Sequence, residues 1–226
     1  MSLLTLSFDN GPDPEVTPRV LDTLRERDVR AHFFVLGKHL LERAGRALVE
    51  RAVDEGHLVG NHSFSHEVPL GEDSRPNSVE AEIGGTEELL SPLIGGAKRF
   101  RPFGGGGAIG PHLLSEAAVE FLVARGYTCV LWNSVPRDWE DPDGWPQRAL
   151  ADCGALSHSV LVLHDIAGAS AAKLGHFLDR AQGDLGAEIV LELPLSCTPI
   201  VTGRIACDIR PFVASRDHAE PRVNAP

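Results

Sequence analysis

Short apolar runs alternate with longer amphipathic stretches along most of the chain, and this alternation restricts the fold more than any other feature. The runs are typical of buried strands, whereas the longer stretches repeat their apolar residues about every 3.6 positions, as a helix does. We expect strands at residues 3–8, 31–36, 57–60, 98–101, 127–132, 159–163 and 188–193, and helices at residues 17–27, 40–55, 78–90, 114–124, 144–153 and 169–181. About seven strand–helix units predict an α/β fold whose parallel sheet closes, or nearly closes, into a barrel.

The length of the chain favours one domain. Its 226 residues, 42% of them hydrophobic, are enough for a single well-packed core. Beyond Gly203 the periodicity is lost and Arg, Pro and Ala dominate. We therefore expect one domain over residues 1–203 and a poorly ordered C-terminal tail over residues 204–226.

Charge and composition exclude several classes of partner. With 21 basic and 32 acidic residues the net charge is −11, and no Lys/Arg cluster is present, which argues against nucleic acids and anionic membranes. No apolar run approaches a membrane span or a signal peptide, so a cytoplasmic location is expected. The four scattered cysteines lack metal-site spacing and are expected to be free thiols, with a Cys197–Cys207 disulfide as the lesser alternative.

Polar residues follow several of the predicted strands directly. Each has an ordinary structural explanation when it is taken singly, such as a helix cap, a surface ion pair or a hydrogen-bonded core histidine. In a parallel barrel, however, all the strand ends meet on one face, where catalytic residues gather. Together they predict an active site there: Asp9, Asn10, His62, His66, Arg101, Asp138, Trp139 and His164.

Two of the predicted loops carry additional signals. His62 and His66 are four residues apart, so on one helical turn their imidazoles would converge on a single metal ion such as zinc. The Gly-rich loop at residues 104–110 lets a backbone approach a ligand closely, or simply serves as a flexible connector. It lacks the glycine order of a nucleotide site.

The ordered series SFDNGPDP, HSFSH, FRPFGG, RDW and LVLHD resembles the five motifs of the NodB-homology polysaccharide deacetylases, carbohydrate esterase family four. It spans residues 4–165 in the family's order and spacing. The Asp-Asn-Gly start is similar to the N-acetylmuramic-acid deacetylase branch of that superfamily. The resemblance implies a distorted (β/α)7-type barrel and metal-assisted hydrolysis of an N-acyl amide.

The resemblance also implies a role for each motif residue. Asp9 corresponds to the general base, Arg101 to the arginine that holds it, His164 to the general acid and Asp138 to the acid that supports that histidine. The metal, most simply zinc, would be held by Asn10, His62 and His66. Substrate would contact Trp139, Phe103 and Gly104, and a backbone N–H of residues 103–105 would face the oxyanion.

The chain departs from the family pattern at four positions. Asn10 replaces a carboxylate ligand, so weaker zinc binding is expected because a neutral amide leaves the ion less neutralised. Phe103-Gly104 replaces a proline and an aromatic residue, and Val135 replaces an acid. His32 stands where threonine is usual, and we expect either a hydrogen-bonded structural histidine or an additional ligand, proton carrier or substrate contact.

The substrate is expected to be a small N-acylated amino sugar or an oligosaccharide. Trp132, Trp139 and Trp145 lie close in the sequence and would form one sugar-stacking surface. Two other functions stay open at this point: a metal-independent hydrolase of small amides with the same fold, and a catalytically silent carbohydrate-binding protein.

Overall fold

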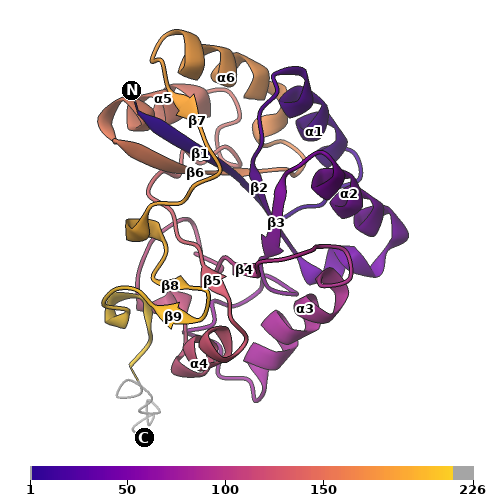
Figure 1. Ribbon diagram of the computed structural model, residues 1–226, viewed down its shortest axis with the longest axis vertical. Coiled ribbons are helices and arrows are strands. Elements are labelled where there is room, and N and C mark those ends of the chain that lie inside the picture. Colours follow the sequence, from indigo (N-terminus) through magenta and orange to yellow (C-terminus); the bar gives the residue numbers. More distant parts are fainter. Residues whose placement is uncertain (1, 216–226) are drawn as a thin grey trace, which may run out of the picture.

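The computed structural model describes residues 2–215, and its central element is a curled sheet of mostly parallel strands (Figure 1). Around the ring the order is β6-β1-β2-β3-β4-β5, and all five of these pairings are parallel. These strands are β1 (Leu3–Asp9), β2 (His32–Val35), β3 (Leu58–Asn61), β4 (Arg99–Phe100), β5 (Thr128–Cys129) and β6 (His158–His164). A parallel bridge between Ser134 and Leu161 returns the chain after β5 to β6, so the predicted distorted barrel is confirmed.

Helices cover the outside of this ring, as Figure 1 shows. They are α1 (Thr17–Glu26), α2 (Arg43–Asp54), α3 (Gly85–Leu90), α4 (Glu116–Ala124), α5 (Trp145–Ala155) and α6 (Leu174–Gly183). A π-helical turn, Glu80–Gly84, leads directly into α3. Short 3-10 turns lie at Gly37–Leu41, Pro111–Leu113, Ser170–Ala172, Leu195–Cys197 and Arg210–Phe212. The six helices match the six expected from the periodicity.

The strands expected at residues 127–132 and 188–193 are much shorter than predicted, with two strand residues each. Val130 N–H bonds to Phe100 O, but the next residue, Leu131, bonds to Cys197 O, so β5 ends early. At the other end of the sheet β7 (Glu188–Ile189) pairs only with the start of β1. The remaining strands, β8 (Ile200–Val201) and β9 (Arg204–Ile205), form an antiparallel extension beside β5.

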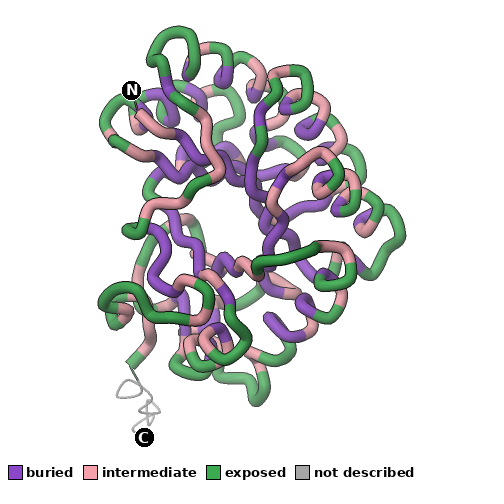
Figure 2. The backbone as a smooth tube through the Cα atoms, in the orientation of Figure 1, coloured by how far each residue is buried: buried purple, intermediate pink, exposed green. Residues whose placement is uncertain are grey.

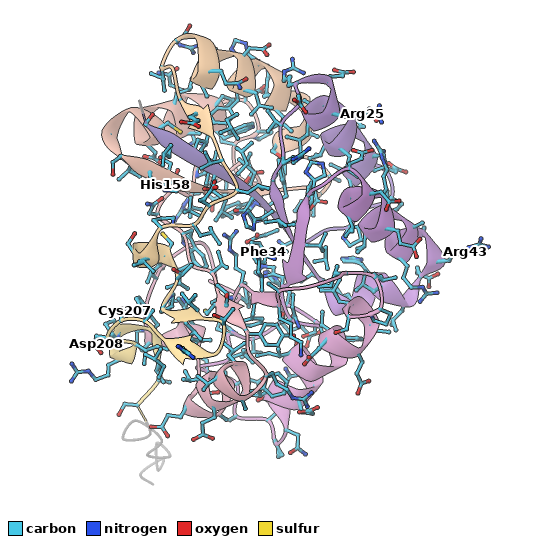
Figure 3. All side chains as sticks on the ribbon, in the orientation of Figure 1. Arg25, Phe34, Arg43, His158, Cys207 and Asp208 are labelled. Carbon is cyan, nitrogen blue, oxygen red and sulfur yellow. The ribbon has the colours of Figure 1, made fainter. Side chains whose placement is uncertain are left out.

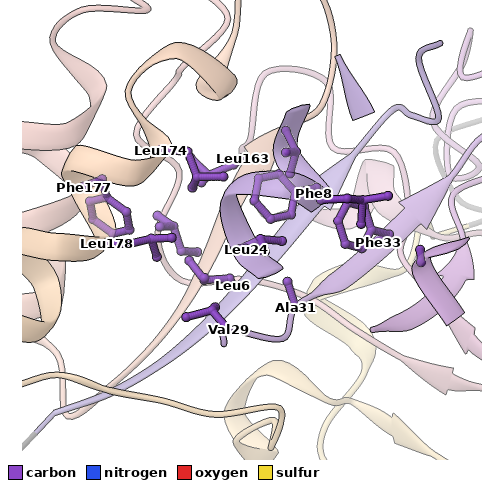
Figure 4. Close-up of a cluster of buried hydrophobic side chains, with 14 of the residues drawn as sticks. Leu6, Phe8, Leu24, Val29, Ala31, Phe33, Leu163, Leu174, Phe177 and Leu178 are labelled. Atoms are coloured by element: carbon purple, nitrogen blue, oxygen red, sulfur yellow. The ribbon is translucent and has the colours of Figure 1, made fainter. Parts of the chain in front are cut away.

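Strand alternation explains how β1 serves both the core and the site. Leu4, Leu6 and Phe8 point outward and are fully buried against the helices, where each side chain contributes about 1.5–3 kcal/mol by leaving water. Figure 4 shows this cluster, with Phe8 beside Phe33. The alternate residues Ser7 and Asp9 point into the ring. Figure 2 shows the buried chain gathered around the strands and the exposed chain at the periphery.

Part of the expected C-terminal tail, residues 204–215, has regular backbone pairing although none of these residues is buried. Arg204–Ile205 forms β9, and the segment after it pairs with Leu114 through Phe212 O and Ala214 N–H. The sequence did not predict this pairing, because backbone pairing with a distant segment leaves no periodic pattern. Residues 216–226, the rest of the expected tail, lie outside the described residues.

The described residues also bear on thiols and membranes. Cys129, Cys153, Cys197 and Cys207 are free, so the Cys197–Cys207 disulfide is not formed. Within residues 2–215 no helix has both the length and the apolar character to span a bilayer.

Candidate active site

A cavity of ≈ 260 Å³ lies at the carboxyl ends of the parallel strands. Eight of the residues predicted for the site line it: Asp9, Asn10, His62, His66, Phe103, Gly104, Trp139 and His164. Arg101 and Asp138 stand directly behind two of them, completely buried. The structure therefore brings all but one of the predicted site residues together.

Asp9, the last residue of β1, is fixed by a buried arginine. Arg101 Nη1 donates to Asp9 Oδ1 at 2.9 Å and to Ser7 Oγ at 2.6 Å. The guanidinium rests on the ring of Phe34, 4.2 Å from its centroid, and Figure 3 shows Phe34 at the centre of the molecule. Burial alone would raise the pKa of Asp9, but opposing contributions, the largest from the charge of Arg101, hold that pKa below its ordinary value. Asp9 is thus a buried, ionised carboxylate, as a general base requires.

His62 has its tautomer set by the backbone. Its Nδ1 lies 2.8 Å from Arg101 O, and because a carbonyl only accepts, Nδ1 carries the hydrogen. Nε2 is therefore left with a lone pair, 3.7 Å from Asp9 Oδ2. Burial lowers the pKa of His62 and lowers that of His66 to about 3. Two neutral imidazoles, with ring centroids 4.9 Å apart, consequently face the cavity.

The expected helical turn across His62 and His66 is not formed. Residues 62–66 are an irregular loop after β3, in which Ser63 and His66 adopt left-handed backbone angles, φ 68° and 59°. These angles, which non-glycine residues adopt rarely, bring the two rings together instead. The spacing predicted the convergence correctly but its cause wrongly.

Asn10 has the buried, unpartnered acceptor expected of a ligand. Its Oδ1 has no hydrogen-bond partner among the described residues, and its backbone is left-handed, at φ 75°. Two imidazole nitrogens and an amide oxygen are donors that suit a divalent ion of the zinc type. Within residues 2–215 no three His, Cys, Asp or Glu side chains form a group able to hold a metal, so a three-donor site here depends on the Asn10 amide.

His164, the last residue of β6, is held from behind by Asp138. The carboxylate accepts His164 N–H through Oδ2 and His164 Nδ1–H through Oδ1, both at 2.8 Å. Burial alone would lower the pKa of His164, but the hydrogen bond and charge of Asp138 raise it above its ordinary value. Trp139 packs edge-on against the imidazole, with centroids 4.7 Å apart. A histidine with a raised pKa, lining the cavity and held through Nδ1 by Asp138, suits a general acid.

The Gly-rich loop is hydrogen-bonded to the rest of the protein at both ends of its glycine run. Trp132 Nε1 donates to Gly107 O at 2.8 Å, and His112 Nε2 donates to Gly104 O at 3.2 Å. A Cβ at residue 104 would lie only 2.6 Å from the Trp132 ring, so glycine is required there. Trp132 thus provides an aromatic wall beside Gly104, where the sequence comparison had led us to expect a missing aromatic side chain.

Two expectations about the site need correction: of its two alternatives His32 is the structural histidine and not a substrate contact, and Trp145 belongs to no sugar-stacking surface. His32 begins β2 at the opposite mouth of the ring: its Nε2 lies 2.9 Å from Leu191 O, and the Phe34 ring is stacked between it and Arg101. Trp145 is fully buried against Phe177, so only Trp132 and Trp139 remain for sugar stacking.

Apolar residues of the cavity wall were missed. They are Pro102, Val162 and Ile166; Val135, noted only as a replaced acid, also lines the cavity. Strand alternation was the available signal for one of them, because Val162 lies two residues before His164 and so faces the same side of β6.

Comparisons with known proteins agree with this geometry. The family model described as polysaccharide deacetylase matches residues 2–117. A peptidoglycan-N-acetylglucosamine deacetylase of Bacillus cereus is 30% identical over 72% of this chain and 72% of its own. A chitooligosaccharide deacetylase of Rhizobium leguminosarum bv. trifolii is 35% identical over 71% of this chain and 70% of its own.

A solved deacetylase structure is also similar to this chain. The Bc1960 peptidoglycan N-acetylglucosamine deacetylase, in complex with 4-naphthalen-1-yl-N-oxidanyl-benzamide, aligns with a TM-score of 0.69 and 28% identity, covering 83% of this chain and 85% of that one. Other matched deacetylases are longer, and the chain spans 35% to 57% of their length.

Proposed function

Because the chain belongs to the polysaccharide deacetylase family, we propose that this cavity hydrolyses the N-acyl amide of an amino sugar. One observation carries the proposal. Asp9 and His164 are register partners on β1 and β6, and their neighbours shift their pKa values in opposite directions. A base and an acid on adjacent strand ends, in one cavity, are what amide hydrolysis needs.

The residues divide the reaction between them. Asp9 takes a proton from the attacking water, and Arg101 keeps the carboxylate ionised and aimed at the cavity. His164 donates its proton to the departing nitrogen, because an amine leaves far more easily than an amide anion. Backbone N–H groups of residues 103–105 stabilise the negative charge that develops on the carbonyl oxygen.

Asn10, His62 and His66 are the residues that would hold a divalent ion. When bound, such an ion supplies Lewis acidity, lowering the pKa of water and polarising the acyl carbonyl. The neutral imidazoles and the unpartnered Asn10 oxygen support this assignment.

The size and lining of the cavity favour a small substrate. Its ≈ 260 Å³ is below the range of about 300–1,000 Å³ for drug-sized ligand pockets, and two tryptophans line it. We therefore propose an N-acetylated mono- or disaccharide unit, with Trp132 or Trp139 against the sugar face.

Acetate release tests the proposal. We would incubate zinc-loaded protein with N-acetylglucosamine, its β-1,4 oligomers and N-acetylmuramic acid, with Asp9→Asn and His164→Ala variants as controls. Release from the mono- or disaccharide that both variants abolish is the expected result. Release only from long oligomers contradicts the small-substrate assignment, and activity that survives chelation contradicts the metal. No release from any substrate contradicts the proposed function.

A further inference from the structure

A buried glutamate outside the cavity reaches the loop that joins His62 to His66. Glu82 lies in the π-helical turn Glu80–Gly84 and is only 4% exposed. Its Oε2 accepts the N–H groups of Phe64 and Ser65 at 3.0 and 2.8 Å, and its Oε1 accepts Ser65 Oγ at 2.7 Å. One carboxylate therefore accepts the N–H groups of two of the three residues between His62 and His66.

The other backbone groups of this loop are also bonded to neighbouring elements. Gly37 N–H donates to Ser63 O, and Lys38 donates to Phe64 O through its N–H and to Ser65 O through Nζ. The carbonyls thus face the turn Gly37–Leu41 while the amides face Glu82. The loop is held on both sides.

Asn61 ties the π-helical turn to the same loop. Its Nδ2 donates to Ile83 O and its Oδ1 accepts Ser63 N–H, both at 2.9 Å. Bulges of the π type are rare and occur mostly at functional sites, and this one positions Glu82 and the Ile83 carbonyl toward the histidine loop. The turn and the loop form one hydrogen-bonded unit.

This unit has a clear physical task. Ser63 and His66 are held at positive φ, which persists only where the surroundings impose it. Charge-assisted bonds from a buried carboxylate to backbone N–H groups are among the stronger neutral-pH contacts a loop can have. Without them the loop would relax and His66 would turn away from His62.

We propose that Glu82 is the positioning residue of the histidine pair: it preorganises His62 and His66 for a divalent ion without touching the ion or the substrate. This inference rests on the proposed function for the identity of the ion. It can be read without any substrate, because it concerns ion affinity and loop order.

The test compares Glu82→Gln with Glu87→Gln in the full chain. Glu87 is a matched control because it is buried to a similar degree and lies about one turn further along, in α3. It pairs with Lys98 rather than with the histidine loop. Glutamine keeps the shape of the side chain but presents an NH2 group to N–H donors. Two quantities are measured: the zinc Kd, by competition with a chelating dye, and amide hydrogen exchange at residues 64 and 65 in metal-free protein.

We expect Glu82→Gln to weaken zinc binding at least tenfold and to speed exchange at residues 64 and 65, while Glu87→Gln changes neither. Ser65→Ala, which removes a single contact of the carboxylate, should give a smaller shift in the same direction and covers the case in which Glu82→Gln fails to fold.

Equal effects in the two glutamate variants would show general destabilisation and overturn the proposal, as would unchanged exchange and affinity in Glu82→Gln. Wild-type protein that takes up no zinc would also overturn it. Zinc binding and loop effects as expected, but without acetate release, would contradict the proposed function and leave the role of Glu82 standing.

Discussion

The carboxylate of Asp138 accepts two hydrogen bonds from His164, one from the backbone N–H and one from Nδ1–H, each at 2.8 Å. The backbone bond fixes where the residue lies, and the side-chain bond fixes which nitrogen faces the cavity. Orientation and protonation of the general acid therefore depend on the same buried group.

Replacing Asp138 should move the high-pH limb of the rate profile. Asp138 raises the pKa of His164 against the effect of burial, so this pKa should fall in Asp138→Asn. The kcat–pH profile should then decline at lower pH than in the wild type, with kcat at pH 8 reduced about 10²–10⁴-fold. Asp141→Asn, at an exposed pair with Arg148, is the control and should behave as wild type. An unmoved limb in Asp138→Asn would contradict the role of Asp138.

The hydrogen bond between Asp138 and His164 Nδ1 also predicts how the stability of the protein depends on pH. Because the folded pKa of His164 is raised, the stabilisation from its protonation is complete below pH 6.5 and is lost as pH rises through the folded pKa. The free energy of unfolding of the wild type should therefore exceed that of Asp138→Asn by more at pH 5.5 than at pH 9. Urea titrations at the two values measure this, and a difference that grows with pH would refute it.

Arg101→Leu should leave Asp9 as an unpaired buried charge. Breaking a buried pair from one side costs about 3–5 kcal/mol, and the double variant Arg101→Leu/Asp9→Asn should recover part of it. Since Arg101 lowers the pKa of Asp9, its stabilising effect is present above the ordinary value of 3.8 and fades as pH falls through the folded pKa. Urea unfolding at pH 7 and at a series of pH values below 3.8 tests this; a double variant no more stable than the single one would contradict it.

Asn10→Asp should strengthen zinc binding and lower the thermal stability of the metal-free protein. A carboxylate neutralises the ion better than an amide, so the zinc Kd should fall tenfold or more, about 1.4 kcal/mol. Without the ion, two acids beside one another repel, and the Tm should drop. Asn77→Asp is the control, because Asn77 is exposed and has a similar left-handed backbone. Chelator competition and thermal unfolding measure both effects; unchanged zinc affinity in Asn10→Asp would argue against Asn10 as a ligand.

Gly104→Ala should destabilise the protein through Trp132. The new Cβ would overlap the indole ring, and overpacking of this kind costs about 1–3 kcal/mol. In a Trp132→Leu background the same change should cost much less. Gly154→Ala is the control, because nothing lies within 4 Å of its Cβ and its helix should gain about 0.5–1 kcal/mol. Equal costs of Gly104→Ala in both backgrounds would disprove the contact.

The sequence predicted the architecture because its rules are local. Apolar periodicity placed all six helices, and the parallel strands followed from their alternation with them. Parallel strand ends share one face, so the sequence alone assigns Asp9, Arg101 and His164 to a common site. The free cysteines followed from spacing in the same way.

Only the tertiary structure decided how deep each residue lies in the ring and which distant segments pair. Strand alternation predicts that His32 faces inward, but not that Phe34 separates it from the cavity. The reason is that alternation fixes the face of the sheet on which a side chain lies and not its height along the axis of the ring. The pairing of residues 204–214 and the burial of Trp145 depend on segments far away in the chain.

The histidine loop shows the division most sharply. The spacing of His62 and His66 was enough to predict that they converge, but the left-handed angles that achieve it are imposed by Glu82, Asn61 and the turn at Gly37–Leu41. Residue types and spacing therefore determined which groups this protein can bring to a site. Long-range hydrogen bonds decided their geometry, because strained backbone is stable only where distant partners hold it.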